Sequence, residues 1–165
     1  MLIAFGGVAR KVDRKRRNCR VQLSKRTEYG LRAIVQLAKL PPNQFVQSRD
    51  LAKQENLPNK FLEAILLALK RGGFLESKVG SGGGYCLSRS AKQINVGDLV
   101  RRLEGRLSAR DSAMPKDMAP GETAVYLINE RLTVATDEAL AKMTLEDLVT
   151  EVGEHSKGQQ EMYYI

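Results

Sequence analysis

Apolar residues between positions 45 and 87 are spaced as in two short helices followed by two strands. Four of them recur at helical spacing and predict the buried face of a helix from Asn59 to Arg71: Leu62, Ile65, Leu66 and Leu69. A shorter helix is predicted from Ser48 to about residue 56. Leu57-Pro58 predicts the turn between them, because proline lacks an N–H and has a fixed φ. Side-chain caps are expected from Ser48 and Asn59. The pattern predicts a helix-turn-helix.

A glycine-rich hairpin is predicted directly after the second helix. Gly72-Gly73 ends that helix, and two apolar segments, Phe74-Leu75 and Tyr85-Cys86-Leu87, then flank the stretch VGSGGG. Its glycines allow positive φ and close approach of the backbone to a phosphate or a minor groove. A helix-turn-helix with such a hairpin is a winged helix, whose second helix enters a DNA major groove. A hairpin without any ligand has the same glycine pattern, so DNA binding stays open at this point.

Two further helices are predicted to complete the domain. Ser24 is expected to cap a helix that stops at Pro41-Pro42 and buries Leu31, Ile34, Val35 and Ala38. A second helix, from Val96 to Leu103, should pack on the core through Val96, Leu99, Val100 and Leu103. Between them, the segment FVQ (45–47) is predicted to pair with the wing.

One long helix is predicted from Thr123 to Lys142. Its apolar residues step by three or four and form a narrow seam, like that of a coiled coil: Val125, Ile128, Leu132, Ala135, Ala139 and Met143. A dimerisation helix and a helix packed on its own domain both give this pattern. Residues 150–165 are predicted to be a frayed tail. The predicted fold class is mainly α with a small β-wing: a winged helix-turn-helix domain plus a long C-terminal helix.

The charge of the chain changes sign along its length. Residues 1–20 hold seven Lys/Arg and one acid, residues 21–90 hold eleven and five, and residues 91–165 hold nine and thirteen. The predicted winged helix is therefore basic and suits phosphates, whereas the acidic C-terminal part suits a partner. With no apolar run of 18 residues and no secretory signal, a cytoplasmic location and no membrane contact are expected.

Four stretches along the chain together resemble one family. They are LSKRTEYGLRAIVQLAKL (23–40), the core with its GGGY wing (45–85), INVGDLVRRLEG (94–105) and MTLEDLV (143–149). They are similar to the Rrf-two family, the IscR/NsrR/CymR group of bacterial winged-helix repressors. The resemblance implies a homodimeric, sequence-specific regulator of transcription. It divides the chain into an extension (1–20), a DNA-binding domain (21–105), an effector-type loop (106–122), a dimerisation region (123–149) and a tail (150–165).

The predicted contacts with double-stranded DNA lie on the second helix and the wing. Asn59 can pair with adenine, Lys60 with guanine or phosphate, and Glu63 with cytosine N4; Glu63 also matches a glutamate that the resembled family uses near bases. A solvated helix acid is the alternative for Glu63. Lys70, Arg71 and Lys78 suit phosphates. The complete predicted set is Ser48, Pro58, Asn59, Lys60, Glu63, Lys70, Arg71, Lys78, Gly80, Ser81, Gly82 and Gly83.

The sequence departs from the resembled family in two places. Val79 stands where cluster-binding members often carry an arginine that enters the minor groove, which valine cannot do. The loop from Arg106 to Glu122 has none of the three cysteines that hold a [2Fe–2S] cluster in the iron–sulfur members. Because such clusters need thiolates, no cofactor is predicted. A small molecule or a protein, bound near the loop and the long helix, is then the expected effector.

Three features remain open from the sequence. Residues 1–20 are interpreted as an artefact of a start codon misplaced from Val21, with a phosphate-binding arm or a disordered tail as alternatives. Cys86 is expected to face solvent, since Tyr85 and Leu87 should face the core. With His155 as the single histidine and no nucleophile–base arrangement, an enzyme is not expected. The alternative to a regulator is a protein-interaction scaffold that kept the fold without specific DNA binding.

Overall fold

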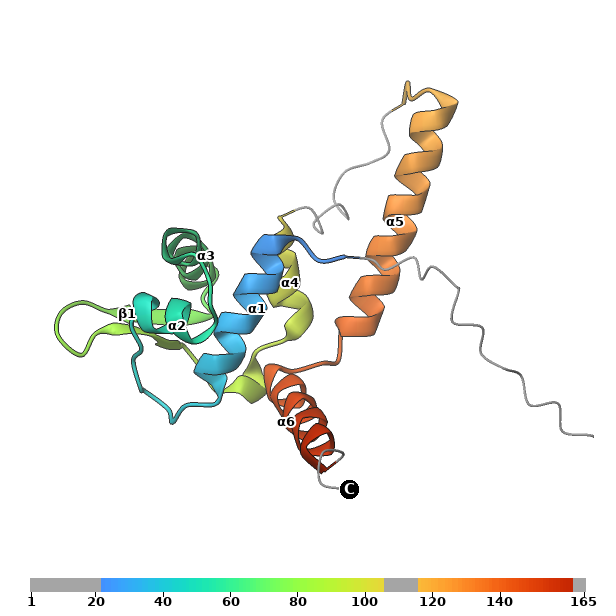
Figure 1. Cartoon of the computed structure of the whole chain (residues 1–165). Coiled ribbons are helices and arrows are strands. Elements are labelled where there is room, and N and C mark those ends of the chain that lie inside the picture. Colours follow the sequence, from blue (N-terminus) through green and yellow to red (C-terminus); the bar gives the residue numbers. More distant parts are fainter. Residues whose placement is uncertain (1–21, 106–115, 162–165) are drawn as a thin grey trace, which may run out of the picture.

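The computed structural model describes residues 22–105 and 116–161 (Figure 1). The predicted N-terminal extension and most of the predicted effector loop, residues 106–115, lie outside them. In chain order the elements are α1 (Lys25–Ala38), α2 (Ser48–Gln54), α3 (Asn59–Arg71), β1 (Leu75–Lys78), β2 (Gly84–Leu87), the 3₁₀ turn η1 (Ala91–Gln93), α4 (Val96–Glu104), α5 (Pro120–Leu140) and α6 (Leu145–Glu161). The predicted class, mainly helical with a two-stranded wing, is confirmed.

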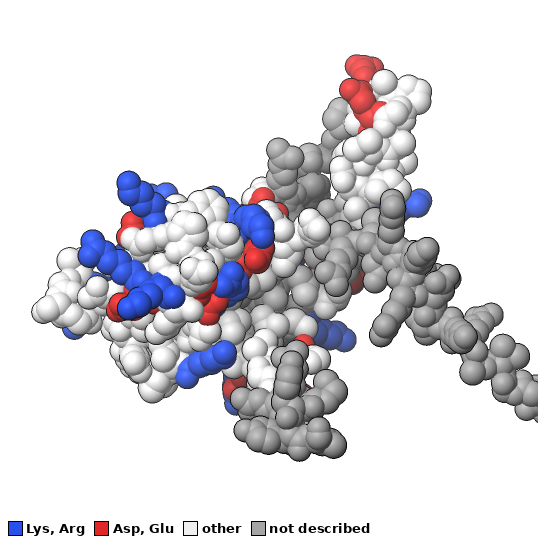
Figure 2. All heavy atoms as spheres, in the orientation of Figure 1, with Lys and Arg blue, Asp and Glu red and all other residues white. Residues whose placement is uncertain are grey.

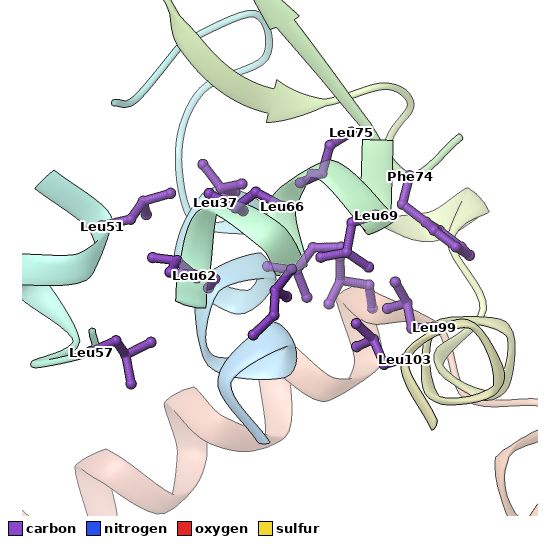
Figure 3. Packing of buried hydrophobic residues seen from close by; sticks show 14 of the residues in the cluster. Leu37, Leu51, Leu57, Leu62, Leu66, Leu69, Phe74, Leu75, Leu99 and Leu103 are labelled. Carbon is purple, nitrogen blue, oxygen red and sulfur yellow. The ribbon is translucent and has the colours of Figure 1, made fainter. Parts of the chain in front are cut away.

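The core gathers around α3, which lies between α1, α2 and α4. Its predicted stripe is confirmed, because all four apolar residues are buried. Leu51, Phe74 and Leu103 close around this stripe from three other segments (Figure 3). Since burying one leucine stabilises a fold by about 1.5–3 kcal/mol, this cluster fixes the position of α3 and therefore of its exposed face.

Helix α1 begins as predicted but buries a different set of residues. The Ser24 hydroxyl accepts a hydrogen bond of 3.2 Å from the Thr27 N–H and caps the helix. Ile34 is buried as expected, whereas Leu31, Val35 and Ala38 are only half-buried. The buried face consists of Thr27, Gly30, Ala33, Ile34 and Leu37. It is rotated because small residues on this side let α1 approach the other helices closely: a Cβ on Gly30 would lie 2.6 Å from a Leu103 methyl.

The two strands of the wing pair antiparallel, with Leu75 opposite Leu87 and Lys78 opposite Gly84. Val46 bridges to Tyr85, which confirms the pairing predicted for the FVQ segment. Cys86 lies on the face of β2 opposite to Tyr85 and Leu87, as predicted, but the expectation that it faces solvent was wrong. It is buried because the segment after α1, residues 41–44, lies beside this face and lines a hollow together with the thiol.

Helix α4 packs on the core through the four predicted residues, all of which are buried. The prediction of a frayed tail after residue 150 was wrong, since α6 continues to Glu161. Its first residue, Leu145, is buried in the core. The start of α6 is capped reciprocally: Thr144 Oγ1 donates to Asp147 Oδ2 at 2.7 Å, and the Asp147 N–H donates to Thr144 Oγ1 at 3.2 Å.

This cap gives α6 a defined dependence on pH. The hydroxyl and the N–H of Thr144 both donate to Asp147, and they lower the pKa of its carboxyl below its ordinary value. A lowered pKa in the folded state means that the contribution is present at neutral pH and is lost as the pH falls below about 4. Asp147→Asn should therefore reduce helix content by circular dichroism at pH 7, and its curve should meet that of the wild type at pH 2.

Glu151→Gln is the control for this prediction, because Glu151 lies exposed on the same helix but outside the cap. This variant should follow the wild type at every pH. A difference between Asp147→Asn and the wild type that persisted unchanged at pH 2 would contradict the role of the ionised cap.

Helix α5 projects away from the rest of the protein (Figure 1). It begins at Pro120 and ends at Leu140, so the predicted bounds of 123 and 142 were shifted, and Met143 lies beyond the helix. Proline suits this first position because its missing N–H has no partner there. Three residues of the predicted seam are exposed large side chains, Val125 at 62%, Ile128 at 55% and Leu132 at 44%. The alternative of a helix packed through this seam on its own domain is therefore wrong for the described protomer.

Candidate nucleic-acid interface

The exposed side of α3 is the natural candidate for contact with DNA. Its buried residues occupy one side of the helix, so positions stepping by four, three and four occupy the other: Lys60, Ala64, Leu67 and Arg71. Pro58 precedes the helix and is also exposed. The N-terminal half of this face carries the polar groups that could meet base edges, and its C-terminal end carries Lys70 and Arg71.

Glu63 is held by two side chains that were predicted to be helix caps. The Ser48 hydroxyl and the Asn59 amide both donate to Glu63 Oε1, at 3.2 Å and 2.9 Å. The capping predictions were wrong: Gln47 and Pro58 occupy the N-cap positions, and neither forms a side-chain cap. Ser48 and Asn59 are instead the first residues of their helices, and their donor groups, the Ser48 hydroxyl and the Asn59 amide N–H, bind Glu63.

The arrangement around Glu63 leaves the carboxylate able to do further chemistry. Both donors engage Oε1, while a carboxylate has a second oxygen that can accept a hydrogen bond from an amino group. The two contacts also restrict the rotamer of Glu63, because they come from separate helices. A side chain fixed in this way can present Oε2 to a base edge with little further loss of conformational freedom.

The remaining predicted cations lie where α3 meets the wing. Lys70 Nζ donates to Ser77 Oγ at 2.6 Å and so joins the end of α3 to β1. Arg71 and Lys78 are exposed near this junction. Figure 2 shows lysine and arginine side chains over α2 and α3, whereas acidic residues lie at the free end of α5. This distribution matches the change of sign along the sequence and favours approach of phosphates to the winged helix.

The tip of the wing is uncharged and extends into solvent. Val79 is 95% exposed, and Gly80, Ser81 and Gly82 are also exposed. Gly83 is buried in the turn, where its N–H donates to the Gly80 carbonyl at 3.0 Å, and a Cβ there would lie 2.3 Å from the Lys78 carbonyl oxygen. The turn alone therefore requires glycine at this position. Contact of the wing with DNA stays a prediction.

One cation of this surface was missed in the sequence. Arg49 is exposed in the first turn of α2, beside Ser48. A basic residue at the second position of the first helix of a helix-turn-helix is a signal that could have indicated it, since that helix crosses the DNA backbone. Arg49 therefore joins Lys70 and Arg71 as a candidate for phosphate contact.

The described residues do not fit an iron–sulfur cluster. Within 22–105 and 116–161 there is no group of three or more histidine, cysteine or acidic side chains that could hold a metal ion. Cys86 is the cysteine among the described residues. Burial raises the pKa of its thiol, and so does the charge of Glu76, which lies opposite it on the neighbouring strand. A raised pKa disfavours the thiolate that a cluster or a redox sensor requires.

Within residues 22–105 and 116–161, no helix is long and apolar enough to cross a bilayer.

Known regulators of transcription are similar to this chain over most of its length. HTH-type transcriptional regulator CymR of Bacillus subtilis is 30% identical over 143 residues, which cover 87% of this chain and 97% of CymR. A solved structure of CymR, the global cysteine regulator of B. subtilis, has a TM-score of 0.63 and covers 80% of this chain and 98% of its own. The structure of T. potens IscR, 26% identical, also has a TM-score of 0.63 and covers 87% of this chain and 97% of its own.

These relatives are regulators of transcription, not enzymes, and they do not favour the scaffold alternative. The Rrf2 family model, described as an iron-dependent transcriptional regulator, matches residues 23–151, which include every described element from α1 to the first turns of α6. The predicted family and the predicted function as a DNA-binding regulator are confirmed. The chain belongs to the Rrf2 family of winged-helix transcriptional regulators.

Proposed function

We propose that the protein is a homodimeric repressor that reads its operator through α3. The observation that carries this proposal is the combination, on one protomer, of an oriented Glu63 on an exposed helix face and an exposed apolar seam on α5. The first supplies sequence recognition, and the second supplies a surface for a second copy of the chain. A protein that acts on the chromosome of a bacterium works in the cytoplasm.

Base recognition is assigned to the first turns of α3, and phosphate contact to its end and to the wing. Glu63 would accept from cytosine N4, while Asn59 and Lys60 flank it. Lys70, Arg71, Lys78 and the backbone of the wing tip would position the protein without reading bases. Val79 cannot replace an arginine in the minor groove, so recognition rests mainly on the major groove.

Substitution of Glu63 and of Lys70 should therefore have different effects. Glu63→Ala should change the preferred base at one operator position by about 1–3 kcal/mol, because a direct base contact is lost. Lys70→Ala should weaken binding to all sequences alike and reduce the slope of log K against log salt by about one unit. Gel shifts with operator variants in a salt series measure both quantities. Equal behaviour of the two variants would show that α3 is placed wrongly on the DNA.

The dimer is assigned to α5. Exposed apolar side chains at coiled-coil spacing extend over several turns of a helix that buries little of its own surface. Two such helices packed together would bury both seams, and helix dimers with this spacing are stabilised by knobs-into-holes packing. Two linked recognition helices can then meet two half-sites about 34–36 Å apart.

Repression follows if the bound dimer excludes RNA polymerase from the promoter. Transcripts of the neighbouring genes should then rise when the gene for the regulator is deleted.

No [2Fe–2S] cluster is expected between Arg106 and Glu122, because this stretch of the sequence contains no cysteine. Its Ser, Met and carboxylate side chains lack the thiolate charge that such a cluster needs. Protein prepared without oxygen should be colourless, and reconstitution followed by visible absorbance and iron and sulfide analysis is the measurement. A stoichiometric cluster that survived Cys86→Ser would contradict the ligand argument.

In place of a cluster, the effector is a small molecule or a protein partner that binds near this loop and α5.

A further inference from the structure

The end of α5 is anchored to the beginning of α4. The Asn95 amide donates to the carbonyls of Ala141 and Met143, at 2.9 Å and 3.3 Å, and the Val96 N–H donates to the Met143 carbonyl at 2.9 Å. Asn95 also bridges to Thr144, at the start of α6. These contacts hold one end of α5 in place. They involve a single turn of the chain, so alone they would act as a hinge.

A second attachment lies about one helical turn from this junction along α5 and about one and a half turns from it along α4. Arg101 Nη1 donates to Asp137 Oδ1 at 2.9 Å. Asp137 is the buried residue of α5, with 8% of its surface exposed. Arg101 also pairs with Asp98 on its own helix. Asp137 lies roughly 140° around α5 from Leu132, given 3.6 residues per turn, so it faces α4 while the seam faces away.

The rest of α5 extends from this pair as an arm. Residues 120–136 rise by 1.5 Å each, which gives a length of about 25 Å. A rotation of only 10° at the pair would move the far end by about 4 Å, and one base pair of DNA rises by about 3.4 Å. The direction of α5 relative to α3 therefore has to be held within a few degrees if a dimer is to distinguish operators that differ by one base pair in spacing.

We propose that the Arg101–Asp137 pair sets the angle between the winged helix and α5, and thereby the half-site spacing that the dimer accepts. The inference rests on the proposed dimer. Arg101 and Asp137 are positioning residues, since they lie on the helices that support α3 and the seam and belong to neither surface. Their contact fixes a direction because it adds a second point of attachment, which the junction at Asn95 alone cannot supply.

The test compares variants of the pair with a matched control. Arg101→Leu, Asp137→Leu and the double variant each remove the contact, and Asp137→Asn keeps the shape of the side chain without its charge. Asp98→Asn is the control, because it removes the other acidic partner of Arg101 without touching α5. Each full-length protein is first analysed by sedimentation. Binding is then measured on the operator selected from random DNA by the wild type, and on copies with one or two base pairs added or removed between the half-sites.

The wild type and Asp98→Asn should be dimers that bind the selected spacing at least about tenfold more tightly than a spacing changed by one base pair. The pair variants should remain dimers, lose about tenfold in affinity for the selected spacing, and bind the changed spacings almost equally well, since a loosely held arm is less preorganised. The effects of the two single leucine variants should not add in the double variant, because both remove the contact between Arg101 and Asp137.

Two results would overturn the inference while leaving the proposed dimer intact: pair variants that dimerise and keep the wild-type spacing preference, or single leucine variants whose effects add in the double variant. Pair variants that sediment as monomers would also overturn it, because the contact would then serve assembly and not direction. A wild type that sediments as a monomer would refute the proposed function itself and the inference with it.

Discussion

A Leu132→Glu variant should sediment as a monomer and lose operator binding. Leu132 lies in the middle of the exposed seam of α5, so the substitution would place a carboxylate from each protomer in the dimer interface. Burying an unpaired charge costs at least several kcal/mol, and here the cost arises twice in each dimer. A monomer carries a single recognition helix and cannot span two half-sites, so gel shifts on the full operator should show loss of the specific complex.

Leu127→Glu provides a matched control for this prediction. Leu127 is 42% exposed, nearly the same as Leu132, and lies on the same helix, but about 140° away from it around the helix axis. This variant should stay dimeric and bind the operator. If Leu127→Glu separated the protomers and Leu132→Glu did not, the interface would lie on a different face of α5.

A Gly84→Ala variant should lose roughly 3 kcal/mol in its free energy of unfolding and bind DNA poorly. Gly84 has a φ of +142°, and a Cβ there would lie 2.2 Å from the Val46 carbonyl oxygen. Backbone cannot move aside as the end of a flexible side chain can, so Val46 and Tyr85 would be forced apart. Val46 precedes Ser48 by two residues, and the strain would therefore reach α2 and the contact that orients Glu63.

Denaturant unfolding and gel shifts measure the two effects of Gly84→Ala. Gly153→Ala is the control, because a Cβ at Gly153 meets nothing within 4 Å and the residue lies inside α6. This change should stabilise the protein by up to about 1 kcal/mol, since alanine favours a helix over glycine by that amount. A Gly84→Ala protein as stable as the wild type would show that the contact between the strand at Val46 and the wing is not close.

Patterns that depend on neighbours in the sequence were predictable here. The stripe on α3 and the four buried residues of α4 follow from helical periodicity, and both were placed correctly. The end of α3 was also placed correctly, because Gly73, with a φ of +75°, marks it. The start of α6 could have been found as well: Thr144 and Asp147 have the spacing of a capping box, but the polar composition after Thr150 was interpreted as a frayed tail.

Features that depend on distant residues were not predictable from the sequence alone. Ser48 has the composition of a helix cap, yet its hydroxyl donates to Glu63, which lies fifteen residues further along the chain on another helix. Cys86 alternates correctly along β2, but a loop more than forty residues earlier covers its face. Likewise the attachment of α5 depends on Arg101 and Asp137, thirty-six residues apart, and no local pattern pairs them.

The exposure of α5 has a consequence for how the protein responds to dilution. Most of the stability of a helix in a protein comes from packing of its apolar face, and α5 buries one residue on its own protomer. Its helical structure is then linked by mass action to the concentration of protomers, whereas the winged helix has a core of its own. As the protein concentration falls, α5 should melt and become sensitive to proteases before the winged helix unfolds. The amount of regulator in the cell therefore sets the fraction of it that can bind the operator as a dimer.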